Sequence, residues 1–263
     1  MNRAAVAIKQ IIILMNRTIQ SAIISVYHKD QLEPIIDQLN QLGVTIYSTG
    51  GTQKFIEVQG ASGTAVVDLS SYPSILGGRV KTLHPKVFGG ILYRRENEGD
   101  QSQAGEYDIP ELDLVIVDLY PFEDTVASGA SEADIIEKID IGGISLIRAA
   151  AKNYRDVLVV SSRSQYQSLL ELLKEKKGTT SLEDRKTFAL GAFQTSAHYD
   201  TAISNYFTGE ASASLFPKEG LTKKTLRYGE NPHQSAEFYG NLDEMLEQIH
   251  GKELSFNNLV DIA

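Results

Sequence analysis

The sequence predicts an α/β protein: a parallel sheet with helices on both faces, followed by a helical segment and an incomplete second domain. Two observations predict this class. Short apolar segments rich in β-branched residues alternate with segments whose apolar residues recur at helical spacing. Of the 263 residues, 42% are hydrophobic and 22% are charged, as in a folded globular chain. Strands separated by helices pair in parallel, and ligands then bind at their carboxyl ends.

The first strand and the first helix show the two patterns. Residues 21–27 (Ser-Ala-Ile-Ile-Ser-Val-Tyr) are apolar and β-branched, which predicts a buried strand. The next segment has its apolar residues on one helical face, with Pro34 in the first turn and Gly43 at the C-terminal cap. That face consists of Leu32, Ile35, Ile36, Leu39 and Leu42.

The later elements follow from the same patterns. The sequence predicts four further strands, at residues 44–48, 64–67, 113–119 and 156–161. It predicts a helix that carries Phe55 and Ile56, and further helices at residues 132–138, 145–152, 165–176 and 182–207.

The chain is expected to have four parts. Residues 1–20 form an N-terminal extension, since a second Met-Asn-Arg begins at Met15. Residues 21–207 form the main domain with its C-terminal helices. The small polar segment 208–214 is a linker, and residues 215–263 are too few for a complete second domain.

Composition excludes several kinds of site and partner. The chain has no Cys, which excludes disulfides, zinc–thiolate sites and Cys nucleophiles. Its net charge of -9 disfavours binding to nucleic acid. Lys9 and Gln10 interrupt the apolar N-terminal stretch, which is therefore neither a membrane span nor a secretory signal. We expect a cytoplasmic protein with no nucleic-acid or membrane partner.

A glycine-rich turn follows the second predicted strand. In Thr49-Gly50-Gly51-Thr52 the glycines allow close approach of a ligand, and the helix that follows offers free N–H groups to a phosphate. Lys29, after the first strand, is placed to neutralise the same phosphate. For a lone Gly-Gly a tight strand–helix turn is the commoner explanation, as an exposed lysine is for Lys29, and the motif does not imply ATP or a dinucleotide.

A second segment, Gly77-Gly78-Arg79-Val80-Lys81-Thr82-Leu83-His84-Pro85, has a glycine pair followed by two cations. Arg79 and Lys81 are suited to bind carbonyl or phosphate oxygens, which favours a binding loop over a solvated loop. His84, before a proline, is expected to be structural.

Three residues are candidates for acid–base chemistry. Lys152 ends a predicted helix, where a cation is favourable on dipole grounds alone. Asp140 is a candidate partner for it, because an acid beside a lysine sets both protonation states. Tyr120 offers a phenol to a developing oxyanion. The sequence shows no metal-ligand cluster and no Ser-His-Asp set, so these residues indicate proton transfer on a phosphorylated small molecule.

Six ordered motifs resemble the IMP cyclohydrolase domain of the bifunctional purine biosynthesis enzyme. They are Ser25-Val26, Ser48-Thr49-Gly50-Gly51-Thr52, Gly78-Arg79-Val80-Lys81-Thr82-Leu83-His84-Pro85, Leu119-Tyr120-Pro121-Phe122, Ile139-Asp140-Ile141-Gly142-Gly143 and Arg148-Ala149-Ala150-Ala151-Lys152-Asn153. Residues 226–234 and 251–258 are similar to the opening of its formyltransferase (AICAR transformylase) part. The resemblance covers the chain from about residue 21 to its end.

The resemblance implies a methylglyoxal-synthase-like fold that closes the ring of formyl-AICAR ribotide to give IMP and water, without a cofactor. It implies that Asp140 and Lys152 move the proton, while Lys81 and Tyr120 stabilise charge on oxygen. The implied substrate-binding residues are Lys29, Thr49, Gly50, Gly51, Thr52, Arg79, Thr82, Asp118, Ile141 and Gly142, with the 5′-phosphate on Lys29 and residues 49–52.

The resemblance also concerns the second part of the chain. Arg227 and Tyr228 match positions that contact the formyltransferase substrate, whose formyl donor is 10-formyltetrahydrofolate. The Lys-His pair of that reaction would lie beyond Ala263, so we expect no formyl transfer by these residues alone. The expected partner is a purine ribonucleotide, and a homodimer is possible.

Two departures and two rival functions accompany the resemblance. Tyr27-His28 stands where the family often has Ser-Asp, and Asp118 where it usually has Asn, which adds an acid near the base. A methylglyoxal synthase would need a catalytic aspartate in a glycine-rich segment, which the sequence lacks. A non-catalytic nucleotide-sensing module, of the kind appended to carbamoyl phosphate synthetases, would keep the phosphate loop without the four catalytic residues.

Overall fold

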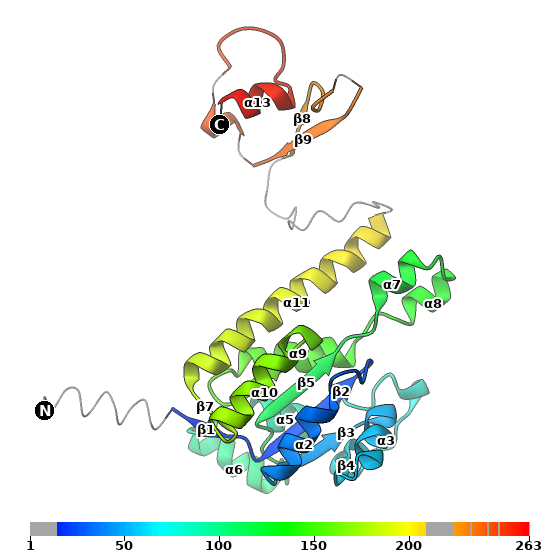
Figure 1. Ribbon diagram of the computed structural model, residues 1–263, viewed down its shortest axis with the longest axis vertical. Helices are drawn as coiled ribbons and strands as arrows, with labels where there is room; N and C mark the ends of the chain where they lie inside the picture. Colours follow the sequence, from blue (N-terminus) through cyan, green and yellow to red (C-terminus); the bar gives the residue numbers. More distant parts are fainter. Residues whose placement is uncertain (1–14, 209–222, 232, 241, 247, 263) are drawn as a thin grey trace, which may run out of the picture. The chain divides into compact units, whose positions relative to one another are not determined.

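The computed structural model describes residues 15–208, 223–231, 233–240, 242–246 and 248–262. The chain divides into two compact units, Met1–Ala211 and Ser212–Ala263. The first unit contains a sheet covered by helices, and the second contains a short hairpin with two short helices (Figure 1).

The first unit is built on a parallel five-stranded sheet, which confirms the predicted α/β class. The strand order is β4-β3-β2-β5-β6, so β2 lies in the centre. Ala22 of β2 pairs with Ile46 on one side and with Leu114 on the other. The strands are β2 (Ser21–Val26), β3 (Thr45–Ser48), β4 (Gly63–Ala65), β5 (Leu114–Asp118) and β6 (Leu158–Val160).

Alternate residues of the strands point into two separate cores, one on each face of the sheet. Ile24 and Ile116 belong to one core, whereas Ile23 and Val115 belong to the other. This alternation is expected of a sheet with helices on both faces. The first core includes residues of α2 (Glu33–Gln41), α3 (Gly50–Val58) and α10 (Tyr166–Glu175). The second core includes residues of α4 (Val66–Ser70), α5 (Pro85–Leu92) and α9 (Gly142–Lys152). Helix α11 (Leu182–Thr208) contributes residues to both cores.

Several elements differ from the prediction. The third strand ends at Ala65, because the next residues form the short helix α4. Helix α9 begins at Gly142 rather than at residue 145, and the Asp140 carboxylate, one residue before the N-cap Ile141, accepts the Gly143 N–H of its first turn at 2.6 Å. Helix α8 (Glu132–Ile136) lies where a helix was expected. The sequence did not predict the helices α4, α5, α6 (Glu98–Glu106) and α7 (Phe122–Ala127), or the 3-10 turns η1 (Leu76–Gly78) and η2 (Arg163–Gln165). It also did not predict the pairing of β1 (Arg17–Thr18) with β7 (Thr179–Thr180).

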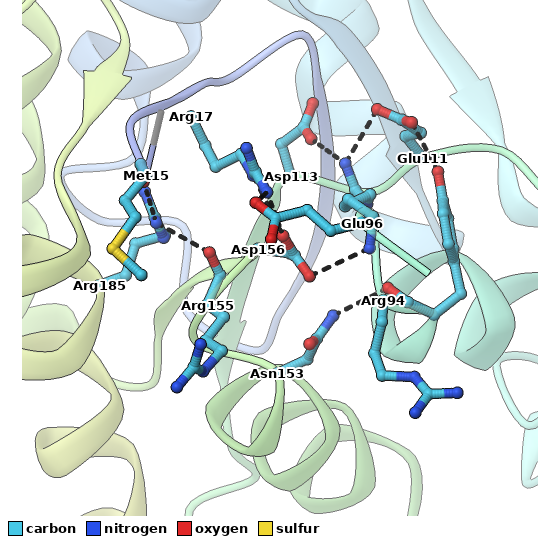
Figure 2. Close-up of polar contacts among 12 residues, drawn as sticks. Met15, Arg17, Arg94, Glu96, Glu111, Asp113, Asn153, Arg155, Asp156 and Arg185 are labelled. Carbon is cyan, nitrogen blue, oxygen red and sulfur yellow. Dashed lines mark hydrogen bonds and ion pairs between the residues drawn. The ribbon is translucent and has the colours of Figure 1, made fainter. Parts of the chain in front are cut away.

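Residues 15–20, assigned to an N-terminal extension from the sequence, pack on the first unit instead. The guanidinium of Arg17 lies 2.9 Å from the carboxylate of Asp156, and Arg185 donates to the carbonyl of Met15 at 2.7 Å (Figure 2). These contacts lie at the amino edge of the sheet, where Asp113 precedes β5. The rest of the predicted extension, residues 1–14, lies outside the described residues.

The second unit contains a small antiparallel hairpin. Its elements are β8 (Lys223–Leu226), β9 (Ala236–Tyr239), α12 (Leu242–Met245) and α13 (Phe256–Ile262). The predicted linker at residues 208–214 falls outside the described residues after Thr208. Within the described residues, no helix is both long enough and apolar enough to cross a membrane.

Candidate active site

A cavity of about 720 Å³ opens at the carboxyl edge of the sheet, where the ends of β2, β3 and β5 meet. Every predicted catalytic or substrate-binding residue of the first unit lines it, except Gly50 and Lys152. Gly50 lines an adjoining cavity instead. The lining of the main cavity consists of Ser25, Val26, Tyr27, Lys29, Thr49, Gly51, Thr52, Gly77, Gly78, Arg79, Lys81, Thr82, Asp118, Tyr120 and residues 136–143.

Two lysine side chains flank the Gly50-Gly51 turn. Gly50 has a φ of +49°, in the left-handed region that favours glycine. A Cβ on Gly51 would lie 3.8 Å from Lys29 Nζ, and a Cβ on Gly50 would lie 4.0 Å from Lys81 Nζ. Helix α3 begins at Gly50, and the N–H groups of Gly50 and Gly51 precede the first bond of the helix, which the Thr52 N–H donates to the Thr49 carbonyl at 3.1 Å. Free backbone donors beside two ammonium groups suit a phosphate.

The Lys29 ammonium is held at the end of β2. Its Nζ donates to the carbonyl oxygens of Val26 at 2.9 Å and Tyr27 at 2.7 Å. Burial lowers the pKa of Lys29, and the neighbouring Lys81 lowers it further, while Asp118 acts in the opposite direction. Lys29 is therefore a fixed, half-buried cation rather than the solvated lysine of the alternative interpretation.

Thr52 has a different role from Thr49 in the same turn. The Thr52 hydroxyl is buried and donates to the Val26 carbonyl at 3.1 Å, so it ties α3 to β2. Thr49 precedes α3, and its side chain makes no hydrogen bond that caps the helix. Thr49 is thus the better placed hydroxyl for a ligand, whereas Thr52 supports the turn.

The loop between α4 and α5 brings cations to the cavity. Gly77 and Gly78 have φ values of 66° and 87°, which turn the backbone before Lys81 and Thr82. The Arg79 guanidinium forms an ion pair with the Glu137 carboxylate, and both residues line the cavity. The segment thus lines the cavity, and its role as a binding loop stays a prediction. His84 has the expected structural role, because its ring accepts the N–H of Lys86 at 3.2 Å at the start of α5.

Asp140 sits at the N-terminus of α9 with its carboxylate facing the first turn. Burial raises the pKa of Asp140, although the Gly143 N–H and the positive charge of Lys81 oppose this effect. A carboxylate with a raised pKa is a stronger base than an exposed one. A Cβ on Gly142 would lie 2.7 Å from Thr82 Oγ1, so the missing side chain lets this turn approach the opposite loop.

Tyr120 follows β5 and keeps its proton. Burial raises the pKa of the Tyr120 phenol, and the nearby Asp140 and Tyr27 raise it further. The Tyr120 and Tyr27 rings meet edge to face with centroids 5.5 Å apart. A protonated phenol in a cavity is suited to donate a hydrogen bond to a developing oxyanion.

Asp118 and His28, two residues that depart from the pattern of the family that the sequence resembles, contact each other. The Asp118 carboxylate accepts the backbone N–H of His28 at 2.8 Å and lies 2.8 Å from His28 Nδ1. Arg163 Nε lies 3.9 Å from the other carboxylate oxygen. The acid that replaces an amide is therefore held by a histidine and an arginine at the cavity wall, which offsets its repulsion of an anionic ligand.

Lys152 does not line the cavity. It is exposed at the C-terminus of α9, ten residues after Gly142, and a rise of 1.5 Å per residue separates the two by about 15 Å. The structure therefore does not bring Lys152 and Asp140 together within one chain. The favourable end of the helix dipole explains the position of Lys152. Its catalytic role stays a prediction from the resemblance alone.

Sequence reasoning missed several residues around Asp140. Lys138 Nζ lies 5.3 Å from the ring centroid of Tyr27 and 5.8 Å from that of Tyr120. The Tyr199 hydroxyl accepts the N–H of Asp140 at 2.9 Å from a position 59 residues further along the chain. The position of Lys138, two residues before a candidate acid, was a usable signal in the sequence. No local pattern connects Tyr199 with this site.

The cavity contains more cations than carboxylates. Lys29, Arg79, Lys81 and Lys138 face the carboxylates of Asp118, Glu137 and Asp140. An excess of positive charge suits an anionic ligand, although the whole chain is acidic. In the described parts of the chain, no group of three or more His, Cys, Asp or Glu side chains is arranged to hold a metal ion.

Arg227 and Tyr228 lie in the second unit and contact each other. The Arg227 guanidinium lies 4.8 Å from the centroid of the Tyr228 ring. A hydrogen bond with Ser255 and the charge of Arg227 lower the pKa of Tyr228. A shallow hollow in this unit is lined by Gly229, Glu230, His233, Gln234, Ser235, Ala236 and Phe256.

Two family models match the chain, one after the other. The model described as an MGS-like domain matches residues 31–145. The model described as the AICARFT/IMPCHase bienzyme matches residues 150–263. Together they cover residues 31–145 and 150–263, which include four of the five strands of the sheet but not β2.

Relatives with known names cover most of the chain. The bifunctional purine biosynthesis protein PurH of Bacteroides thetaiotaomicron is 63% identical over 248 residues, which are 94% of this chain and 48% of that protein. PurH of Rhodopirellula baltica is 46% identical over 255 residues, with 93% and 49% covered. The chain thus spans about half the length of the curated relatives it matches. A crystal structure of ForH is similar with a TM-score of 0.63 and 35% identity, and the match covers 73% of this chain and 99% of ForH.

Proposed function

Because the chain belongs to the AICARFT/IMPCHase bienzyme family, we propose that its first unit closes the six-membered ring of formyl-AICAR ribotide to give IMP and water. One observation carries the proposal. Lys81, Tyr120 and Asp140 line a single cavity together with a glycine turn that is flanked by two lysines. This ring closure requires a site that binds the 5′-phosphate of the substrate, a group that accepts a proton, and hydrogen-bond donors to the oxygen that gains charge.

Binding begins at the 5′-phosphate. The free N–H groups at the start of α3 and the Lys29 ammonium receive it, with Thr49 as a hydroxyl donor. The base and ribose then extend toward Thr82 and Gly142, between the two loops that face each other. This orientation puts the reacting carboxamide and formyl groups beside Asp140.

In the bond-forming step, the carboxamide nitrogen attacks the formyl carbon. A C–N bond forms, the formyl π bond breaks, and its oxygen gains negative charge. The Tyr120 phenol donates to this oxygen, and the Lys81 ammonium stabilises the charge. Asp140 accepts the proton that the nitrogen loses, since its pKa is raised by burial. The oxygen receives one proton from Tyr120, which regains it from Asp140, and a second proton equivalent to the one that the formamide nitrogen loses. The C–O bond then breaks, water leaves, and the electron pair of the formamide N–H bond forms the C=N double bond of the ring.

Proximity supplies a large part of the acceleration. The two reacting groups belong to one molecule, so ring closure does not require the binding of a second substrate. Holding them in contact reduces the entropy cost of the reaction, by an amount that reaches about 7–11 kcal/mol in favourable intramolecular cases. The steps involve only proton transfer and charge on oxygen, so side chains suffice and we propose no cofactor.

The test is an absorbance assay of IMP formation from formyl-AICAR ribotide. We expect turnover by the 263-residue chain and a large loss in Tyr120→Phe and Asp140→Asn. A folded chain that binds IMP and does not form it would favour the rival sensing module. Methylglyoxal formation from dihydroxyacetone phosphate would favour the rival synthase.

The proposal includes the finer expectations from the sequence. We propose a purine ribonucleotide as the partner, action in the cytoplasm, and no role for nucleic acid or membranes. We also propose that these 263 residues by themselves do not transfer a formyl group from 10-formyltetrahydrofolate to AICAR ribotide. Release of tetrahydrofolate with both substrates supplied would contradict that part.

A further inference from the structure

Lys138 lies against two aromatic rings of the cavity. Its Nζ is 5.3 Å from the ring centroid of Tyr27 and 5.8 Å from that of Tyr120. Both distances are within the ~6 Å at which an ammonium is attracted to an aromatic face. Lys138 also lines the cavity two residues before Asp140. Nothing in the mechanism described above uses this cation.

The backbone beneath Lys138 is fixed by α11. The Tyr199 hydroxyl donates to the Lys138 carbonyl at 2.7 Å and accepts the N–H of Asp140 at 2.9 Å. Burial raises the pKa of Tyr199 to about 12, so this hydroxyl keeps its proton. The Tyr199 ring packs with Phe122 and Ile135 in a third apolar cluster. A single phenol thus fixes the backbone of Lys138 and of Asp140 together.

We propose that Lys138 is a positioning residue that acts through Tyr120. Its ammonium holds the Tyr120 ring and makes the phenol a stronger hydrogen-bond donor to the oxygen that gains charge during ring closure. The inference deepens the proposed function and depends on it.

The positive charge of Lys138 opposes the electrostatic effect of the other groups around Tyr120. Burial, Asp140 and Tyr27 all raise the pKa of Tyr120, and each thereby weakens the phenol as a donor. A positive charge against the ring acts in the opposite direction, because it stabilises negative charge on the phenol oxygen. Lys138 is half-buried, so water screens this interaction less than at an open surface.

The kinetic test compares three variants. Lys138→Gln should lower kcat by roughly 5- to 30-fold with a smaller change in KM, since a cation–π contact in a partly desolvated site has about that effect. Lys138→Arg should restore most of the rate, because a guanidinium also binds an aromatic face. The matched control is Lys174→Gln, an exposed lysine of α10 away from the cavity, which should keep the normal rate.

A double-mutant cycle shows whether Lys138 acts through Tyr120. In a Tyr120→Phe background the aromatic ring stays and the donor is gone, so Lys138→Gln should then change kcat by less than about twofold. An equal loss in both backgrounds would overturn the inference, since Lys138 would then act on the substrate itself. No loss in the wild-type background would overturn it as well.

A further readout does not need turnover. In protein labelled with fluorotyrosine, fluorine NMR identifies Tyr120 as the resonance missing from Tyr120→Phe, and the phenol then titrates while lysines are still charged. Lys138→Gln should move the titration of Tyr120 to higher pH by about half a unit or more, and Lys138→Arg should not. An unchanged titration overturns the inference. If the wild type forms no IMP, the proposed function fails, and this titration still decides whether Lys138 acts on Tyr120.

Discussion

Replacing Gly143 by Ala tests the role of Asp140 without changing a charge or removing a functional group. A Cβ at Gly143 would lie 2.9 Å from Cγ and 3.0 Å from Oδ1 of Asp140, and closer still to Oδ2. The carboxylate must therefore move and lose its 2.6 Å hydrogen bond from the Gly143 N–H. Displacing the base from the nitrogen whose proton it accepts should lower kcat by roughly 10²-fold, the cost of a misplacement of about 1 Å in a reacting group.

The matched control for this substitution is Gly105→Ala in α6. A Cβ there meets nothing within 4 Å, so alanine should raise the free energy of unfolding by about 0.5–1 kcal/mol through its helix propensity. Initial rates of IMP formation and thermal melting of both variants give the comparison. If Gly143→Ala folds normally and its rate stays within about twofold of the wild type, the assignment of proton transfer to Asp140 is refuted.

Three further predictions concern binding, pH and stability. Lys29→Ala combined with Thr49→Ala should raise KM by roughly tenfold or more with a smaller fall in kcat, because phosphate contacts act in the ground state and the transition state alike; a fall in kcat alone would contradict this. Asp140→Asn should abolish most turnover and yet raise the free energy of unfolding at neutral pH. Burial raises the pKa of Asp140 above its usual 3.8, so the folded state binds this proton more tightly than the unfolded state. The stability of the wild type therefore falls as pH rises from 3.8 through the raised pKa of the folded state, and an uncharged Asn avoids this loss. Denaturant titration of Asp140→Asn and wild type across acidic to neutral pH checks the sign, and a destabilised Asn variant would reverse it. A chain that starts at Met15 should keep its melting temperature and activity. In contrast, Arg17→Ala should lower the free energy of unfolding by about 1–3 kcal/mol, because its buried partner Asp156 loses a charged donor. Equal melting temperatures of Arg17→Ala and the unsubstituted protein would disprove the role of Arg17 in packing.

The sheet and its main helices were predictable because their apolar residues follow the helix and strand periods. Ile35, Ile36 and Leu39 were placed on one helical face and are all buried in α2. Helix α6 was not predictable, because Ala104 is its only buried residue and no apolar period marks it. Its start depends on the Asn97 side chain, which accepts the N–H of Asp100 at 2.9 Å.

Most of the cavity was predictable for a topological reason. Parallel strands end at the same edge, so Lys29, Thr49 and Tyr120 were expected to converge there. What failed was the inference from closeness in sequence to closeness in space. Lys152 lies twelve residues after Asp140, but a continuous helix carries it to the far end of α9.

Contacts between distant segments were beyond the sequence alone. Tyr199 reaches Asp140 from α11 only because Phe122, Ile135 and the Tyr199 ring pack in one cluster. The Asp118–His28 contact likewise depends on the pairing of β2 with β5, which brings the ends of the two strands together. Both contacts join residues that lie far apart in the sequence, so they depend on how the elements pack together rather than on a local pattern.

The central claim is that the cavity at the carboxyl edge of the sheet closes the purine ring. The most direct measurement is the rate of IMP formation from saturating formyl-AICAR ribotide by the purified 263-residue chain, beside Asp140→Asn and Lys174→Gln. The account predicts steady IMP formation by the chain and by Lys174→Gln, with a loss of roughly 10²–10⁴-fold in Asp140→Asn. IMP formation at an equal rate in all three proteins, or none in a folded wild-type chain, would contradict the account.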